Sequence, residues 1–230
     1  YEEQNGVVGA NISRSKLVQR LLGAANVPGF VNELIHTQAV VVAGTEAAGF
    51  LVERTRDDKG EPVFGLRPVA HIRPDQSSAE TRAAAIKAFQ DLVGQCVAES
   101  KDGAIEVGGG GDSIDAQFCL VTLLRSEGEV VAASAVVTRC RDLPRAQERL
   151  TGMQLVAGYF ELYTLKRMNE QSRTIAQSHQ HVLQLSTAVA TAQGFQSAAM
   201  NLCNELATRT GASRVSLGWL KRERIRVKAL

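Results

Sequence analysis

Two segments near the start of the chain carry apolar residues at helical spacing, which predicts two amphipathic helices. Their apolar faces consist of Leu17, Val18, Leu21 and Leu22 in the first segment and Phe30, Val31, Leu34 and Ile35 in the second. Pro28 stands at the start of the second helix, where its missing N–H costs nothing. We expect that face to extend to Val41 and the helix to end near Gly44.

The period then changes from helical to alternating. Residues 48–54 and 63–72 predict two strands joined by a polar turn at 57–60. Pro68 lies inside the second strand and indicates an edge position or a bulge, because proline cannot donate to a ladder. A helix that starts at Ser77 and Ser78 and ends near Ser100 comes next.

Three further strands complete the predicted sheet. A short strand at 105–107 precedes a glycine-rich loop, and two apolar strands at 114–124 and 130–140 form a hairpin. The segment 130–137 is apolar enough to lie in the middle of a sheet. The fold class that we predict is therefore α+β, with a central antiparallel sheet and flanking helices.

A long helix is predicted after the last strand, opened by Asp142 and Pro144 and continuing to Gln193. Between Met153 and Gln193 only Gly158 interrupts the helix-forming sequence, so the helix must leave the domain. A seven-residue spacing indicates a weak heptad seam for a modest parallel homodimer. The predicted dimer residues are Met168, Ile175, Val182, Leu185 and Val189. A single amphipathic helix packed on its own domain is the alternative.

The last part of the chain repeats the order of elements seen at the start. Gly194-Phe195, an amphipathic helix, a glycine and a strand correspond to Gly29-Phe30 and the helix and strand after it. We therefore expect a domain at 11–143, a connecting helix at 144–193 and the first part of a second copy at 194–230. The chain starts at Tyr1, and we expect it to be a piece of a longer protein.

The segment from Phe195 to Leu230, which contains LCNELATRTGASRVSLGWLKRERIRVKAL, resembles the opening of a GAF domain. The segment from about Leu17 to Leu165 resembles a complete but divergent GAF domain in its order of elements. The resemblance implies a GAF/PAS-like sheet, a small-molecule pocket on one face and signalling helices that pair in a dimer. The residue set of the cyclic-nucleotide-binding members has no match, so the cofactor or ligand stays unknown.

Composition narrows the function classes. The net charge of +2 and the aromatic fraction of 5% argue against a nucleic-acid partner. No apolar run spans a bilayer, so we expect no membrane contact within this segment and a cytoplasmic location, although the remaining protein could be anchored. The four cysteines are expected to be reduced and buried. We expect no metal site and no enzymatic activity, because no nucleophile, ligand set or cofactor loop emerges.

The candidate pocket residues come from the predicted sheet and the helix beside it. Alternation places Arg67, His71 and Arg73 on one face, which could bind an anion or face solvent at an edge. Phe50, Phe89 and Phe118 are expected to line the pocket or to fill the core. The first hypothesis is a ligand-binding sensor that relays through the dimerising helix. The alternative is a dimerisation or spacer module without a ligand, of the kind found in bacterial export adaptors.

Overall fold

The computed structural model describes residues 14–56, 62–73, 79–108, 115–221 and 224–229. The chain divides into two compact units, Tyr1–Lys166 and Arg167–Leu230, and each is treated separately below. The predicted turn at 57–60, the helix start at Ser77 and Ser78 and the glycines at 109–111 lie outside the described residues. Among the helices that the structure describes, none combines the length and apolar character needed to cross a membrane.

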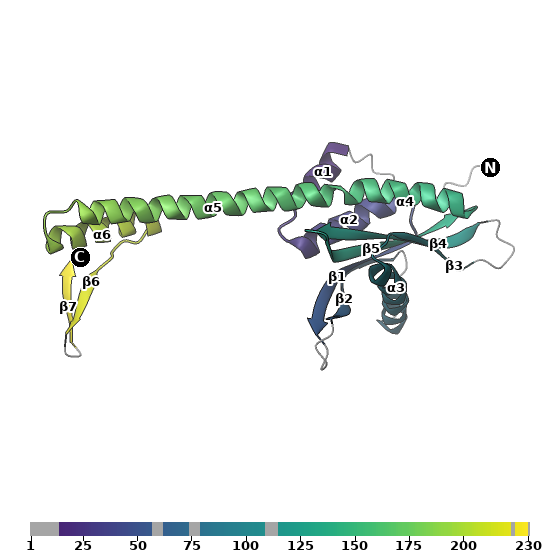
Figure 1. Ribbon diagram of the computed structural model, residues 1–230, viewed down its shortest axis with the longest axis horizontal. Coiled ribbons are helices and arrows are strands. Elements are labelled where there is room, and N and C mark those ends of the chain that lie inside the picture. The colour runs from purple at the N-terminus through teal and green to yellow at the C-terminus, as the bar shows by residue number, and fades with distance from the viewer. Residues whose placement is uncertain (1–13, 57–61, 74–78, 109–114, 222–223, 230) are drawn as a thin grey trace, which may run out of the picture. The chain divides into compact units, whose positions relative to one another are not determined.

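The first unit contains four complete helices and the start of a fifth (Figure 1). The complete ones are α1 (Arg14–Gly23), α2 (Val27–Val41), α3 (Ala79–Glu99) and α4 (Leu143–Ala157). Asn26 caps α2 by accepting a hydrogen bond from the Gly29 N–H, and Asp142 caps α4 in the same way from Arg145. Val41 is about half exposed, so the expectation that it is buried was wrong.

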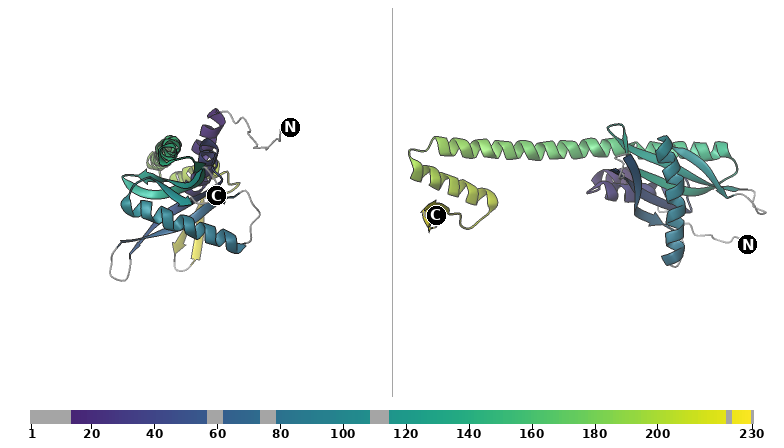
Figure 2. Two further views of the ribbon diagram at one scale, coloured as in Figure 1. Left: turned by 90° about the vertical axis from the view of Figure 1, so that its right-hand side faces the viewer. Right: turned by 60° about the horizontal axis from the view of Figure 1, so that its bottom comes forward.

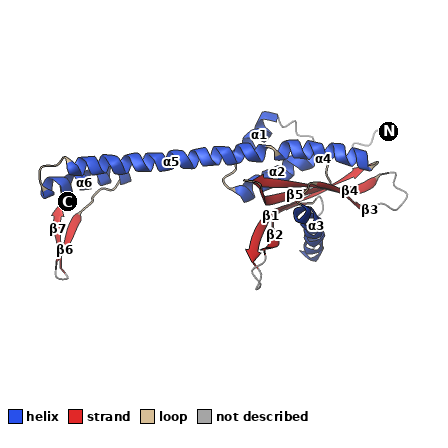
Figure 3. Cartoon of the chain, in the orientation of Figure 1, coloured by secondary structure: helices blue, strands red, loops and turns tan. Residues whose placement is uncertain are grey.

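A five-stranded antiparallel sheet forms the centre of this unit (Figure 3) and confirms the predicted fold class. Its strands are β1 (Glu46–Arg56), β2 (Pro62–Ile72), β3 (Gly103–Gly108), β4 (Ala116–Ser126) and β5 (Glu129–Cys140). The order is β2-β1-β5-β4-β3, so the apolar strand β5 lies in the middle as predicted. Glu127 and Gly128 have φ values of 54° and 82° in the turn between β4 and β5, as a two-residue type I′ turn requires.

The two faces of the sheet carry separate cores. Helices α2 and α4 cover one face, where Phe30, Leu34, Leu120 and Met153 are buried. Helix α3 covers the other face, where Phe89 and Val93 pack among other buried side chains (Figure 2). The helices and the sheet thus form three layers.

Strand β2 lies at the edge of the sheet and contains a bulge. Gly49 pairs with Ala70 and Phe50 pairs with Pro68, so Val69 is the extra residue on β2. Pro68 therefore occupies the setting that the sequence predicted for it, both an edge strand and a bulge. Because of this extra residue, side chains of β2 before and after the bulge that would otherwise share a face of the sheet lie on opposite faces.

The predicted long helix is present with one interruption. Helix α4 ends at Ala157, Gly158 comes next with φ −57° and ψ −23°, and α5 runs from Tyr159 to Ala190. Glycine has a weak helix propensity, so the break at Gly158 lies at a position that favours it, although Gly152 is accommodated inside α4. The helix ends three residues before the predicted Gln193.

The second unit contains the rest of α5, α6 (Phe195–Thr210) and a hairpin of β6 (Leu217–Lys221) and β7 (Arg224–Ala229). Gly211 ends α6 in the left-handed conformation at φ 66°. A helix followed by an antiparallel hairpin is the same order as α2, β1 and β2. A small core of Ala199 and Cys203, with Val215 and Leu217 against it, joins α6 to the hairpin.

Candidate functional site

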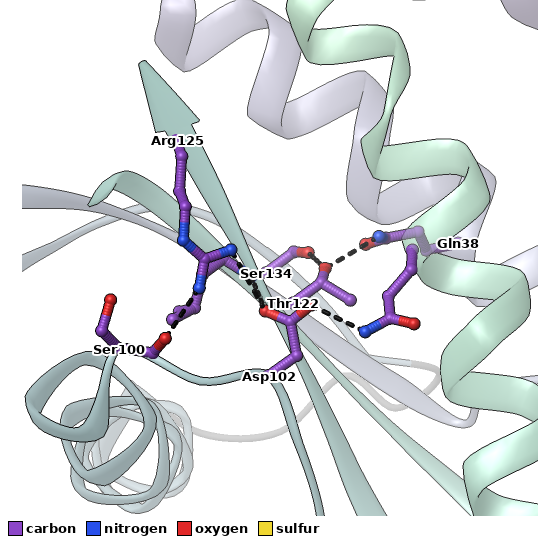
Figure 4. A network of polar contacts seen from close by, with 8 residues as sticks. Gln38, Ser100, Asp102, Thr122, Arg125 and Ser134 are labelled. Atoms are coloured by element: carbon purple, nitrogen blue, oxygen red, sulfur yellow. Dashed lines mark hydrogen bonds and ion pairs between the residues drawn. The ribbon is translucent and has the colours of Figure 1, made fainter. Parts of the chain in front are cut away.

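A buried polar network connects the middle of the sheet to the helices that cover it (Figure 4). The Gln38 Nε2 of α2 donates to Thr122 Oγ1 at 3.0 Å and to the Met153 carbonyl oxygen of α4 at 3.1 Å. Thr122 shares a further hydrogen bond of 2.7 Å with Ser134 on β5. Because all three side chains are buried, this network fixes α2 and α4 at one position on the sheet.

A second polar group links the end of α3 to α4. The Asp102 carboxylate accepts hydrogen bonds from the Leu123 N–H at 2.9 Å and from Gln154 Nε2 at 2.8 Å. Arg125 lies 3.9 Å from Asp102 and donates to the Ser100 carbonyl oxygen at the end of α3, as Figure 4 shows. The segment just after α3 therefore has a direct connection to the helix that leads into α5.

The joint between α4 and α5 is anchored in the core of the first unit. Phe160 and Tyr163 are almost fully buried and pack on Phe30, with ring centroids 5.2 and 4.8 Å from it. Lys166 Nζ donates to the Leu22 carbonyl oxygen at the end of α1, 2.9 Å away. The first two turns of α5 thus belong to the same core as α2.

Three of the five candidate pocket residues lie on the face that α3 covers. His71 Nε2 lies 2.8 Å from Glu46 Oε1, and the His71 ring lies 6.1 Å from the ring of Phe89. Phe50 and Phe89 are 0% and 4% exposed and belong to the core under α3. These phenylalanines fill the space between the sheet and α3.

The other two candidates lie on the opposite face. Phe118 belongs to the core under α2 and α4, and Arg67 is half exposed, with its Nε 2.5 Å from Glu53 Oε1. The bulge at Val69 places Arg67 and His71 on opposite faces, so the predicted common face of these two residues was wrong. Successive side chains of a strand alternate between the two faces of a sheet, and one extra residue moves every later side chain to the other face. The prediction from alternation therefore fails at this bulge.

Two buried nitrogens on the α3 face have no hydrogen-bond partner among the described residues. They are His71 Nδ1 and Arg73 Nη1. The His71 side chain is only 5% exposed, and Arg73 lies 3.9 Å from the same Glu46 carboxylate. Unpaired buried polar groups are costly, and the guanidinium Nη1 of Arg73 is a donor, so it marks a place where an acceptor would be stabilised.

Several hollows lie on the described part of the first unit, among them three with distinct linings. One of about 610 Å³ lies outside α3, between Phe64 and Ala98, and one of about 190 Å³ lies beside the α4–α5 joint near Asp102. A third, of about 490 Å³, lies where α2 ends and α4 begins. Their linings include no candidate pocket residue, because the candidates are core side chains or lie at the edge of the sheet.

The four cysteines are free and buried, as predicted. Burial raises the pKa of the Cys119 thiol to about 12 and raises the pKa of Cys96 as well. A thiol with a raised pKa stays protonated at neutral pH and is a poor nucleophile or metal ligand. Within the described residues no group of three histidine, cysteine or carboxylate side chains is placed to hold a metal ion.

The predicted dimer residues lie on α5 and are mostly exposed. Met168, Ile175, Val182 and Val189 are 58, 48, 59 and 36% exposed, and Leu185 is half-buried. Exposed leucines not singled out in the sequence extend the apolar surface toward the first unit; they are Leu155, Leu162 and Leu165. The seven-residue spacing from Leu155 to Leu162 is the signal that would have identified them.

Comparisons with known proteins give structural matches only. No family model matches the sequence, and no curated protein matches it. The GAF domain of an Acinetobacter phosphoenolpyruvate-protein phosphotransferase has a TM-score of 0.36 at 10% identity, covering 66% of this chain and 92% of that one. A GAF domain/HD domain protein from Geobacter sulfurreducens has a TM-score of 0.34 at 14% identity, covering 62% of this chain and 99% of its own.

A third match is the phytochrome photosensory core module of Stigmatella aurantiaca. Its TM-score is 0.41 at 12% identity, and the match covers 98% of this chain. The chain spans half the length of that module. The descriptions of two of these three solved structures name a GAF domain.

Proposed function

We propose that the chain is a regulatory module in which a GAF-like unit passes a change of state to α5, and that α5 pairs with α5 of a second copy. The observation that carries the proposal is that α5 has a buried beginning and an exposed apolar stripe after it. Its first turns are buried through Phe160 and Tyr163, whereas the residues from Met168 onward expose an apolar stripe. A helix that exposes apolar side chains over several turns is stabilised when a partner buries them.

The composition of the stripe favours a weak and reversible pair. Met168, Ile175, Val182 and Val189 supply one seam position, but Gln171 and Ser178 occupy the matching second position. Polar residues in a seam lower the affinity of a coiled coil and leave room for regulation. The alternative function, a dimerisation or spacer module, would form the same dimer and would differ from a sensor only in binding no ligand.

The dimer is tested by replacing Val182 with aspartate. The charged side chain would be buried at the seam in both copies, so we expect the dimer dissociation constant to rise by about a hundredfold or more. Light scattering over a concentration series measures the change, with a dimer for the unmodified protein and a monomer for the variant.

Gln180→Asp is the matched control, because Gln180 is exposed two residues from Val182 and points to the other side of α5. We expect it to leave the dimer intact. A monomeric unmodified protein, or equal masses for the two variants, contradicts pairing through this stripe.

Binding of a small anionic molecule is the second candidate function. It is supported by His71 Nδ1 and Arg73 Nη1, the two unpartnered buried nitrogens. A carboxylate or phosphate oxygen accepts hydrogen bonds from a guanidinium, which suits Arg73 Nη1. Against it stands the packing of Phe50 and Phe89, which requires α3 to move outward before a ligand can enter.

A thermal-shift screen of carboxylates and phosphates, followed by calorimetry, tests this second function. We expect a bound anion to raise the unfolding temperature in proportion to the logarithm of its concentration. Arg73→Gln should abolish the shift, whereas Arg82→Gln on the exposed surface of α3 should preserve it. A shift that survives Arg73→Gln contradicts binding at this position.

A further inference from the structure

A basic groove lies on the first unit where α2 ends, β5 ends and α4 begins. Its volume is about 490 Å³. The lining residues used below are Val41, Arg139, Arg141, Arg145, Glu148 and Arg149. The groove has no part in the polar network or in the α5 stripe described above, and it lies on the face of the sheet away from α3.

Four arginines face this groove against two carboxylates, Asp115 and Glu148. Arg145 forms an ion pair of 2.6 Å with Glu148, and both side chains are more than two-thirds exposed. The side chains of Arg139 and Arg141 are exposed and have no hydrogen bond or ion pair with the described part of the chain. Among the described residues that line the groove, arginines therefore outnumber carboxylates by four to two.

The guanidinium of Arg149 is engaged in hydrogen bonds with the protein itself, which hold the base of the groove in place. Its Nη1 donates to the Val42 carbonyl oxygen at 2.9 Å, to the Arg139 carbonyl oxygen at 3.1 Å and to Thr138 Oγ1. Arg149 thus caps the C-terminal end of α2 and ties it to β5. The guanidinium groups of Arg139 and Arg141 remain available to an external acceptor on this fixed scaffold. Arg145 shares its guanidinium with the exposed Glu148.

Apolar side chains are exposed beside these charges. Val40 and Val41 at the end of α2 are 69% and 49% exposed, and Leu143 at the start of α4 is 46% exposed. Valines exposed next to arginines suit an occupant that carries both negative charge and apolar surface. The lining contains no aromatic side chain on which a nucleic-acid base could stack.

We propose that this groove docks an acidic segment of a partner protein, with aspartate or glutamate side chains on Arg139, Arg141 and Arg145 and an apolar side chain against Val41. Arginine binds carboxylates in a bidentate manner, and charge complementarity gives such contacts specificity. A flat anionic membrane would not enter a concave site, and a nucleic acid would leave the valines uncovered. The groove lies at the first turn of α4, so its occupant would contact the helix that leads into α5.

The test selects peptides from a random library displayed on phage, with the whole chain as the target. We expect enriched peptides that combine several acidic residues with an apolar one. The affinity of a labelled enriched peptide is then measured by fluorescence anisotropy. The double variant Arg141→Glu with Arg145→Glu should weaken it about tenfold or more, and added salt should weaken it further. Arg82→Glu on α3 is the control and should bind as the unmodified protein does.

Several outcomes would overturn the proposal. They are the absence of enriched peptides, enrichment without acidic residues, and binding that the double variant leaves unchanged. Stronger groove-dependent binding of oligothymidylate or of phosphatidylserine vesicles would assign the groove to a different polyanion. Thermal unfolding verifies that the double variant is folded. As a second variant, Val41→Asp keeps every arginine and should also weaken binding of the same peptides.

Discussion

Replacing Phe30 with alanine is expected to lower the free energy of unfolding of the first unit by about 3–5 kcal/mol. Phe30 is fully buried in the core under α2 and α4 and contacts the rings of Phe160 and Tyr163. The substitution removes apolar burial and leaves a cavity where α5 is anchored. We therefore also expect faster amide hydrogen exchange in the first turns of α5. Chemical unfolding and exchange mass spectrometry measure the two effects.

Phe64→Ala is the matched control for this experiment. Phe64 is 46% exposed on the edge strand β2, where its ring lies under the Arg54 guanidinium. The same change of side chain there should cost about 1 kcal/mol or less, because little buried area is lost. Equal losses for the two variants, or exchange in α5 that Phe30→Ala does not alter, would refute the anchoring of α5 in this core.

Gly49→Ala is expected to destabilise the unit by about 1–3 kcal/mol, although alanine adds only one carbon atom. A Cβ at position 49 would overlap with Val31 Cγ1 and would lie 3.3 Å from Ile35 Cγ2 of α2. Both neighbours are fully buried and have no room to move aside. Helix α2 would have to shift away from β1. Thermal or chemical unfolding measures the loss.

Gly23→Ala is the control and should change stability in the opposite direction. Gly23 ends α1, and an added Cβ would have no neighbour within 4 Å. Alanine restricts the unfolded chain and has a higher helix propensity, so we expect a gain of about 0.4–1 kcal/mol. A destabilisation of the same size at both positions would show that close packing of α2 on β1 is not the cause.

The periodicity of the sequence predicted the elements of the fold because each of them buries one face locally. Alternation located β1 and β2, apolar runs located β4 and β5, and the run at 130–137 indicated the central strand. Seven-residue spacing predicted Met168 and Val182 as dimer residues; both side chains are exposed, and their pairing stays a prediction. Gly158 was visible as the one glycine between Met153 and Gln193, although its effect on the helix was not predicted.

The polar connections could not be predicted from local patterns. Gln38 meets Thr122 and Met153, which are 84 and 115 residues away in sequence. Asp102 meets Gln154 across 52 residues. Such pairs depend on the tertiary arrangement, and a lone polar residue in an apolar segment gives no sign of its partner. The placement of Arg67 failed for a different reason, since the bulge at Val69 cannot be read from alternation alone.

Disulfide cross-linking at Met168→Cys and, separately, at Val182→Cys tests the pairing of α5 most directly. The four native cysteines are buried and should not react under mild oxidation. In a parallel dimer in register, each introduced cysteine faces its own copy within the distance that a disulfide requires. We predict a covalent dimer for both variants and none for Gln180→Cys. Cross-linking of only one of the two variants, or equal cross-linking of Gln180→Cys, would contradict the parallel dimer.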